Sequence, residues 1–192
     1  HHFNREDKPM RVLIAYGSTE GQTRKIAEKS AEHLRQQQHG VQLIDCCELQ
    51  TDFDIFPFDS AIVAASVHQF QHQTEIVDFI IKHKKWLADK PTAFISVSLS
   101  EAFEEDRAEA QLYIDQFIDE TGWQPTHTLS LAGALRYKEY DFMRRWVMKF
   151  MAGAKGAPTD TSKDHEYTDW DKLYAFLDDF TRSGAEQVQA AG

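Results

Sequence analysis

Cysteine is almost absent from this chain of 192 residues, and its two cysteines, Cys46 and Cys47, are neighbours. Adjacent cysteines cannot cross-link distant parts of a fold, so a disulfide framework is excluded and a reducing, cytoplasmic compartment is expected. Two ordinary buried thiols at a strand end are favoured over a strained, redox-active pair. The chain also lacks any apolar run long enough to span a bilayer.

Basic charge is scarce as well. Lysine and arginine number 21 against 31 aspartates and glutamates, and this net charge of −10 argues against non-specific binding to nucleic acid. A hydrophobic content of 42% indicates a globular chain with a full core. Residues 1–9 begin with two histidines and are interpreted as a tag remnant, residues 10–182 as one domain, and residues 183–192 as a flexible tail.

The most informative stretch is 11–23, RVLIAYGSTEGQT, in which an apolar run ends at Gly17 and a helical pattern begins after Thr23. This order predicts a strand, a turn rich in hydroxyls and glycine, and a helix. The N–H groups and dipole of a helix N-terminus favour a bound phosphate, and glycines let the backbone approach it. No lysine follows the second glycine and G-x-G-x-x-G is missing, so neither a nucleoside triphosphate nor a dinucleotide is predicted. An ordinary capped turn is the alternative.

Gly-Ser-Thr-x-Gly-x-Thr in this position resembles the FMN phosphate loop of the flavodoxins. On that resemblance the phosphate-binding residues are Ser18, Thr19, Glu20, Gly21, Gln22 and Thr23.

Strands and helices are predicted to alternate along the rest of the chain. Further strands are expected at residues 41–46, 60–66, 92–97 and 127–132, and further helices at 75–87, 110–118 and 170–180. Gly40 and Gly122 are expected to close helices, and Thr168 to cap the last one. The alternation predicts an α/β fold: a flavodoxin-like, doubly wound, five-stranded parallel sheet in the order 2-1-3-4-5, with an inserted segment after strand five.

Ligands of such a sheet lie at the carboxyl ends of the strands, so two further loops join the predicted FMN site. They supply Ser66, Val67, His68, Gln69 and Phe70 after strand three, and Ser98, Leu99 and Ser100 after strand four. Phe70 is expected to stack on the flavin ring. His68 and His72 are candidates to donate protons or bind an anionic substrate, against the alternative that both are solvated. No carboxylate or cysteine accompanies them at ligand spacing, so no metal is predicted.

The insertion, residues 133–167, is a segment that a plain electron carrier does not need. Over residues 141–151 the sequence predicts an amphipathic helix, with Phe142, Trp146 and Met151 on its apolar half and Lys149 among the cations of the other half. Such a helix suits peripheral contact with the inner face of a cell membrane, or packing on the protein body with its cations solvated.

Three features together resemble the menaquinone-dependent protoporphyrinogen IX dehydrogenases, the HemG family: AGALRY at 132–137, the basic aromatic helix, and TDTSKDHEYTDW at 159–170. The resemblance implies FMN, oxidation of protoporphyrinogen IX to protoporphyrin IX, and delivery of electrons to a membrane quinone. It also implies that Arg136 and Tyr137 contact the substrate, Arg136 through a propionate. Residues 101–120 depart from the family by being strongly acidic, which disfavours a tetra-anionic porphyrinogen.

Three functions stay open at this point. The first is the enzyme just named, in which the flavin carries the redox chemistry and no protein side chain is assigned as a catalytic base. The second is a flavodoxin-type electron-transfer protein, whose acidic surface would dock basic redox partners. The third is another FMN-dependent quinone or NAD(P)H oxidoreductase, although the sequence contains no second nucleotide-binding fingerprint.

Overall fold

The computed structural model describes residues 8–17, 21–48, 53–68, 71–135, 144–152 and 165–191. Five parallel strands form its central sheet in the order β2-β1-β3-β5-β6, which confirms the predicted doubly wound topology. They are β1 (Arg11–Gly17), β2 (Gly40–Asp45), β3 (Ser60–His68), β5 (Thr92–Ser98) and β6 (His127–Ala132). A short strand, β4 (Gln71–His72), turns back along the end of β3 and pairs with it in the antiparallel sense.

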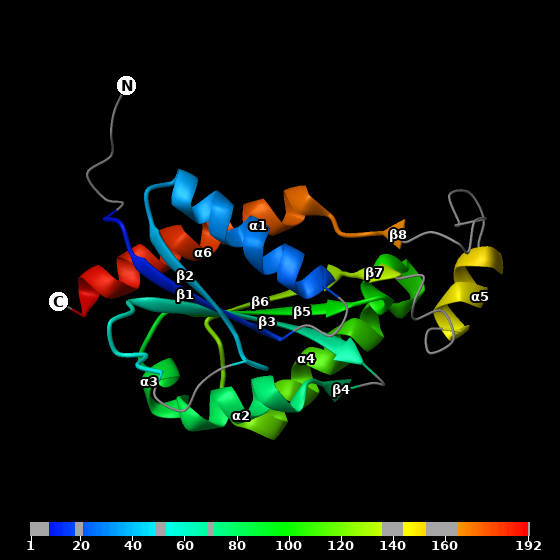
Figure 1. The fold of residues 1–192 in the computed structure, drawn as a ribbon, viewed down its shortest axis with the longest axis horizontal. Coiled ribbons are helices and arrows are strands. Elements are labelled where there is room, and N and C mark those ends of the chain that lie inside the picture. The colour runs from blue at the N-terminus through cyan, green and yellow to red at the C-terminus, as the bar shows by residue number, and fades with distance from the viewer. Residues whose placement is uncertain are drawn as a thin grey trace.

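Helices cover both faces of the sheet (Figure 1). One face carries α1 (Gln22–Gln36) and α6 (Trp170–Ala190), and the other carries α2 (Thr74–Lys82), α3 (Lys84–Ala88) and α4 (Arg107–Thr121). Two short 3-10 turns, η1 (Ser100–Ala102) and η2 (Glu104–Asp106), lead from β5 into α4. Every residue of β5 is buried, as expected for a parallel strand that is covered on both sides.

Alternation along β1 divides the core into two layers, because successive side chains of a strand point to opposite faces. Val12 and Ile14 pack with residues of α1 and α6, whereas Leu13 and Ala15 pack with residues of α2 and α4. All four are fully buried. Burial of each of the larger aliphatic side chains contributes about 1.5–3 kcal/mol, so both helix layers are fixed to the same central strand.

Two predicted helix ends differ from the structure. The helix expected over residues 75–87 is divided into α2 and α3 at His83, which has a φ of −106° and a ring that packs against two phenylalanines. After α1 the positive φ (72°) belongs to Gln38, and Gly40 is instead the first residue of β2. Gly122 does end α4 in the left-handed conformation (φ 68°), as predicted.

The segment expected to be a flexible tail, residues 183–192, is instead helical as far as Ala190. Ala185 is buried, and a Cβ added to Gly184 would lie 3.3 Å from the Cβ of Pro91. The backbone of α6 at Gly184 therefore lies close to Pro91, in the segment before β5. The folded domain therefore continues beyond residue 182.

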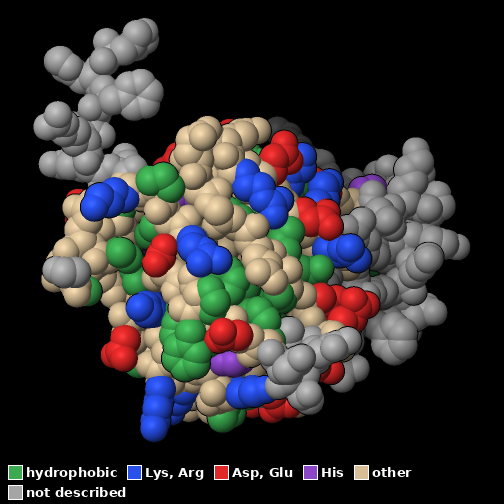
Figure 2. All heavy atoms as spheres, turned by 60° about the vertical axis from the view of Figure 1, so that its left-hand side comes forward, with side chains coloured by type: hydrophobic (Ala, Val, Ile, Leu, Met, Phe, Trp, Pro, Cys, Tyr) green, Lys and Arg blue, Asp and Glu red, His purple; other side chains and the backbone are tan. Residues whose placement is uncertain are grey.

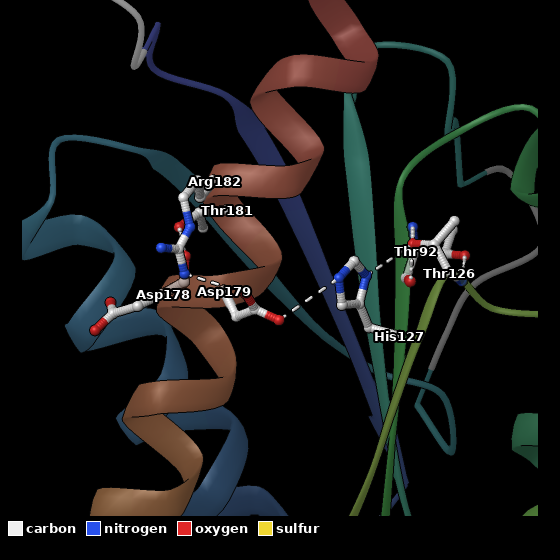
Figure 3. A network of polar contacts seen from close by, with 7 residues as sticks. All are labelled: Thr92, Thr126, His127, Asp178, Asp179, Thr181 and Arg182. Carbon is white, nitrogen blue, oxygen red and sulfur yellow. Dashed lines mark hydrogen bonds and ion pairs between the residues drawn. The ribbon is translucent and has the colours of Figure 1, made fainter. Parts of the chain in front are cut away.

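A polar network ties α6 to the amino-terminal edge of the sheet (Figure 3). His127 lies between Asp179 (4.0 Å, Nε2 to Oδ2) and Thr126 (3.1 Å, Nδ1 to Oγ1). The hydroxyl of Thr126 donates to the backbone oxygen of Thr92 at 2.6 Å. Because that hydroxyl hydrogen is engaged with a carbonyl, the threonine is not activated as a nucleophile. The network is a structural tie at the edge opposite the predicted site.

The insertion after β6 contains three described elements: β7 (Ala134–Leu135), α5 (Arg144–Ala152) and β8 (His165–Glu166). β7 and β8 pair in the antiparallel sense, so the insertion leaves and returns at the same place. Figure 1 shows α5 and β8 beyond the carboxyl ends of the strands. The insertion is therefore attached at the edge where the ligand is expected.

Candidate functional site

The loops predicted to form the site meet at the carboxyl edge of the sheet. In register, Gly17 at the end of β1 pairs with Ala65 of β3, and Ser66 pairs with Val97 of β5. Figure 1 shows the N-terminus of α1 and the arrowheads of β3 and β5 at the same end of the molecule. The three loop starts are therefore brought together as the topology requires.

The turn after β1 leads into α1 through a left-handed glycine. Gly21 is the N-cap residue, with a φ of 87°, and its carbonyl accepts a hydrogen bond from the backbone N–H of Lys25 at 3.0 Å. Glycine has no side chain with which to cap a helix, so α1 does not begin with an ordinary hydroxyl cap. The first turn thus directs its N–H groups and the positive end of its dipole toward the predicted phosphate position. Thr23, in that turn, is buried.

The buried side chain of Gln22 ties α1 to the end of the insertion. Its Nε2 donates to Thr168 Oγ1 (2.9 Å) and to Glu166 Oε2 (3.2 Å). Thr168 in turn donates to the backbone oxygen of Ala132 at 2.7 Å. Thr168, the residue expected to cap α6, therefore makes its hydrogen bonds to Gln22 and Ala132 instead. The cap of α6 is Asp169, whose side chain accepts a hydrogen bond from the backbone N–H of Lys172 at 3.1 Å.

Glu166 is the charged centre of the same tie. It also accepts hydrogen bonds from Lys25 Nζ (2.5 Å) and Trp170 Nε1 (2.9 Å). Burial raises the pKa of Glu166, but the hydrogen bonds from Lys25, Trp170 and Gln22 outweigh it and hold the pKa below its ordinary value. The carboxylate is thus ionised at neutral pH, and it joins α1, β8 and α6 beside the predicted phosphate turn.

Two predicted flavin contacts, Ser66 and Ser98, have buried hydroxyl oxygens without a hydrogen-bond partner in the part of the chain that the structure describes. They lie at the ends of the adjacent strands β3 and β5. A buried polar group left unpaired costs about 1–3 kcal/mol, and the alternation of side chains along the strands turns these two hydroxyls to opposite faces of the sheet. Leu99 and Ser100 follow directly and are buried, and Val67 is half-buried beside β4.

His72 is turned toward the protein body. Its ring lies near those of Phe94 and Phe117, at centroid distances of 5.2 and 5.1 Å, and its Nε2 is 2.9 Å from Ser96 Oγ. Burial lowers the pKa of His72 to about 4, so the ring is neutral at pH 7. This placement gives the ring no positive charge with which to bind an anionic substrate at that pH. The side chain instead anchors β4, and with it the loop after β3.

The described part of the insertion helix is packed on the body. Trp146 and Val147 of α5 are half-buried and contact a small hydrophobic cluster built on Leu99 and Leu135. The packed alternative therefore holds for these two residues, but its solvated cations do not: Arg145 and Lys149 are paired with carboxylates. Residues 141–143, where the helix was expected to begin, lie outside the described ranges.

Several predicted site residues also lie outside those ranges: Ser18, Thr19, Glu20, Gln69, Phe70, Arg136 and Tyr137. For His68 the structure describes the backbone, as the last residue of β3. Among the described residues no group of histidine, cysteine and carboxylate side chains could hold a metal ion. Within the same ranges no helix is long and apolar enough to cross a membrane.

The two cysteines differ in environment. Cys46 is half-buried, and burial raises the pKa of its thiol to about 12, whereas Cys47 is exposed. Neither cysteine is part of a disulfide. The expectation of two buried thiols is therefore wrong for Cys47, because β2 ends at Asp45 and Cys47 follows in the turn after the strand.

Comparison with known proteins places this geometry in a family. The chain matches the family described as Flavodoxin domain over residues 13–162, from β1 through α5. The chain belongs to that family.

Curated relatives of this flavodoxin-domain protein confirm the resemblance carried by its motifs. It is 29% identical to the protoporphyrinogen IX dehydrogenase (quinone) of Escherichia coli (strain K12) over 168 residues, which make up 87% of this chain and 92% of that protein. The enzyme of the same name from Leishmania major is 26% identical over 172 residues, 88% of this chain and 74% of that protein. Among solved structures, a flavodoxin from the domain Archaea has a TM-score of 0.52 at 16% identity and covers 94% of this chain and 99% of its own. That structural likeness shows the fold alone.

The tie between Gln22, Glu166 and Thr168 is the feature of this flavodoxin-domain protein that sequence reasoning missed. Gln22 was assigned to the cofactor, and Thr168 to a helix cap. A polar pair separated by more than a hundred residues leaves no periodic signal, so only the fold brings the two ends together. The sequence signal that could have indicated a role for this segment was the family motif at 159–170, which contains Glu166 and Thr168.

Proposed function

We propose that this protein binds FMN and uses it to oxidise protoporphyrinogen IX to protoporphyrin IX, with a quinone as the electron acceptor. The observation that carries the proposal is the extent of the likeness to proteins of that name. The curated relatives align with 87% and 88% of the chain. The family match itself runs through α5, in the insertion that electron transfer alone does not require.

The described residues at the carboxyl edge fit FMN. The first turn of α1, entered through Gly21, suits the phosphate, and Ser66 and Ser98 lie on two neighbouring strands at the edge predicted to hold the ring. When bound, FMN supplies the redox chemistry that protein side chains lack. The chain binds and orients it. His72 holds the loop after β3 in place through its contact with Ser96 of β5. Ser18, Thr19 and Phe70 stay predicted contacts.

The acidic stretch at residues 101–120 is a smaller obstacle to an anionic substrate than its composition indicates. Glu109 is bound by Arg145 (3.0 and 3.2 Å), and Glu101 by Lys172 (2.9 Å). Carboxylates paired within the chain repel a nearby anion less than free ones do. The same pairing weakens the electron-carrier alternative, because these carboxylates are already occupied and are not offered to a basic partner.

Membrane contact through the insertion is a further part of the proposal, and it would use the outward side of α5. Met148 is 60% exposed there, whereas Trp146 and Val147 pack inward. Met148→Glu should therefore reduce sedimentation with anionic lipid vesicles while FMN binding is retained. Equal sedimentation of the variant and the unmodified protein would remove the membrane contact from the account.

The function is tested by turnover. Under anaerobic conditions, FMN-loaded protein supplied with protoporphyrinogen IX and menaquinone should generate porphyrin fluorescence well above the rate without protein. The matched control is the same preparation stripped of FMN. If FMN-loaded protein shows no excess rate with menaquinone or with ubiquinone, the proposal fails and the electron-carrier alternative is preferred.

A further inference from the structure

Ion pairs on two successive turns fasten α5 to the start of α4. Arg145 binds Glu109 through two parallel contacts, Nη1 to Oε1 at 3.2 Å and Nη2 to Oε2 at 3.0 Å. One turn further along α5, Lys149 binds Asp106 and lies 3.3 Å from Glu105 Oε1. Asp106, Glu109, Arg145 and Lys149 are called the α4–α5 clasp below. Two-pronged arginine–carboxylate contacts fix orientation as well as distance.

The carboxylates of the α4–α5 clasp are mostly removed from water. The side chains of Asp106 and Glu109 are 14% and 26% exposed. The hydrogen bonds from Arg145 hold the pKa of Glu109 below its ordinary value, and the hydroxyl of Tyr113 also donates to that carboxylate at 2.7 Å. Partly buried pairs are screened less by salt than pairs on an open surface. The clasp is therefore more than an incidental surface contact.

An aromatic contact lies beside the α4–α5 clasp. The rings of Phe103 and Trp146 are stacked, with centroids 5.9 Å apart and an interplanar angle of 12°. Lys149 Nζ is 4.7 Å from the centroid of Phe103. Leu99 and Val147 belong to the same cluster. Because Leu99 is part of the loop predicted to meet the flavin, α5 packs directly against that loop.

We propose that Asp106 and Glu109 are positioning residues for the reaction. By holding α5, they place Trp146 as one wall of the space through which the organic substrate reaches the flavin. The inference rests on the proposed function, because it assigns that wall to the same site. Two cations of α5, Arg145 and Lys149, are paired within the clasp. The side of α5 that carries Trp146 and Val147 therefore offers aromatic and aliphatic surface, which suits the apolar ring system of a porphyrinogen rather than its carboxylates.

The test is a charge-swap cycle in the FMN-loaded, full-length protein: Arg145→Glu, Glu109→Arg, and both together. Each single variant should raise KM for protoporphyrinogen IX about tenfold with a smaller effect on kcat, and the Kd for FMN should stay within about twofold. The double variant should recover most of the KM, because the pair is restored with its signs exchanged. Lys29→Glu is the matched control for Arg145→Glu: it makes the same change in net charge in an exposed pair on α1 and should behave as the unmodified protein.

Amide hydrogen exchange at residues 99–103 keeps this inference separate from the proposed function. Single clasp variants should exchange faster there, and the double variant should return to the original rate, whether or not the protein turns over a porphyrinogen. If the unmodified protein shows no turnover, the proposed function fails while the exchange result still decides the clasp. Unchanged exchange, unchanged KM in active single variants, or a double variant no better than the singles would each overturn the inference. A purely structural role would lower the melting temperature and leave KM as it was.

Discussion

Gly17 is the residue at which β1 meets the start of α2. A Cβ at this position would lie 2.4 Å from Gln73 Oε1 and 2.9 Å from Ile76 Cγ1, so Gly17→Ala must displace both side chains. We expect the variant to lower the free energy of unfolding by about 1–3 kcal/mol and to weaken FMN binding, as measured by denaturant titration and by flavin fluorescence. Gly40→Ala is the control, because the nearest atom to its added Cβ, Met10 O, is 4.0 Å away. Equal stability of the two variants would contradict this reading of Gly17.

His72 makes the stability of the fold depend on pH. Its pKa is about 4 in the fold against an ordinary 6.5, so between these values the unfolded chain binds more protons than the folded one. Its stabilising contribution is therefore complete above the ordinary pKa and is lost as the pH falls toward 4; the loss between neutral pH and pH ~5 is about 2 kcal/mol. His72→Gln should flatten the dependence of unfolding free energy on pH by that amount. Burial also lowers the pKa of His83, so a smaller pH dependence from that residue should persist in the variant. An unaltered pH dependence in the variant would exclude His72 as its source.

At the scale of residues, the glycines were predictable and the histidine was not. Gly17 and Gly21 stand at fixed places between an apolar run and a helical pattern, and a tight turn at a helix N-terminus has few other solutions. His72 sits in a polar loop, which is typical of solvated side chains. Its partners Ser96 and Phe117 come from other elements, so nothing local indicates that the ring turns inward.

At the scale of elements, the end of α6 supplies a prediction. Deleting residues 183–192 removes the buried Ala185 and the part of α6 that lies close to Pro91. We expect a loss of about 2–4 kcal/mol in unfolding free energy, visible as a lower melting temperature. Deleting residues 191–192 alone is the control and should be neutral, because α6 ends at Ala190. If the longer deletion has the same melting temperature as the control, residues 183–192 do not contribute to the stability of the fold.

The strands were the most predictable elements, and the helix ends the least. A strand buried on both faces, such as β5, can be predicted because it forms a short apolar run in the sequence, here directly after a proline. The last turns of α6 consist of small and polar residues, and their burial depends on Pro91, which is far away in the chain. The break at His83 likewise depends on packing against Phe53, which no periodicity reports.

At the scale of the whole molecule, composition gives the net charge but does not predict which charged side chains form ion pairs with one another. Acidic and basic side chains are interspersed on the face shown in Figure 2. In the α4–α5 clasp, Glu109 and Arg145 come from segments that are separate in sequence. A net charge of −10 therefore does not amount to one open acidic surface. The topology, by contrast, follows from the order of strands and helices alone, which is why the sheet and the edge of the site could be predicted.

The central proposal is that the FMN-loaded protein oxidises protoporphyrinogen IX, with FMN supplying the redox chemistry. The most direct measurement mixes FMN-loaded protein with protoporphyrinogen IX in the absence of oxygen and quinone, and records flavin absorbance and porphyrin fluorescence together. Flavin absorbance should fall in step with the rise in porphyrin fluorescence. A flavin that stays oxidised, with no porphyrin formed, would contradict it.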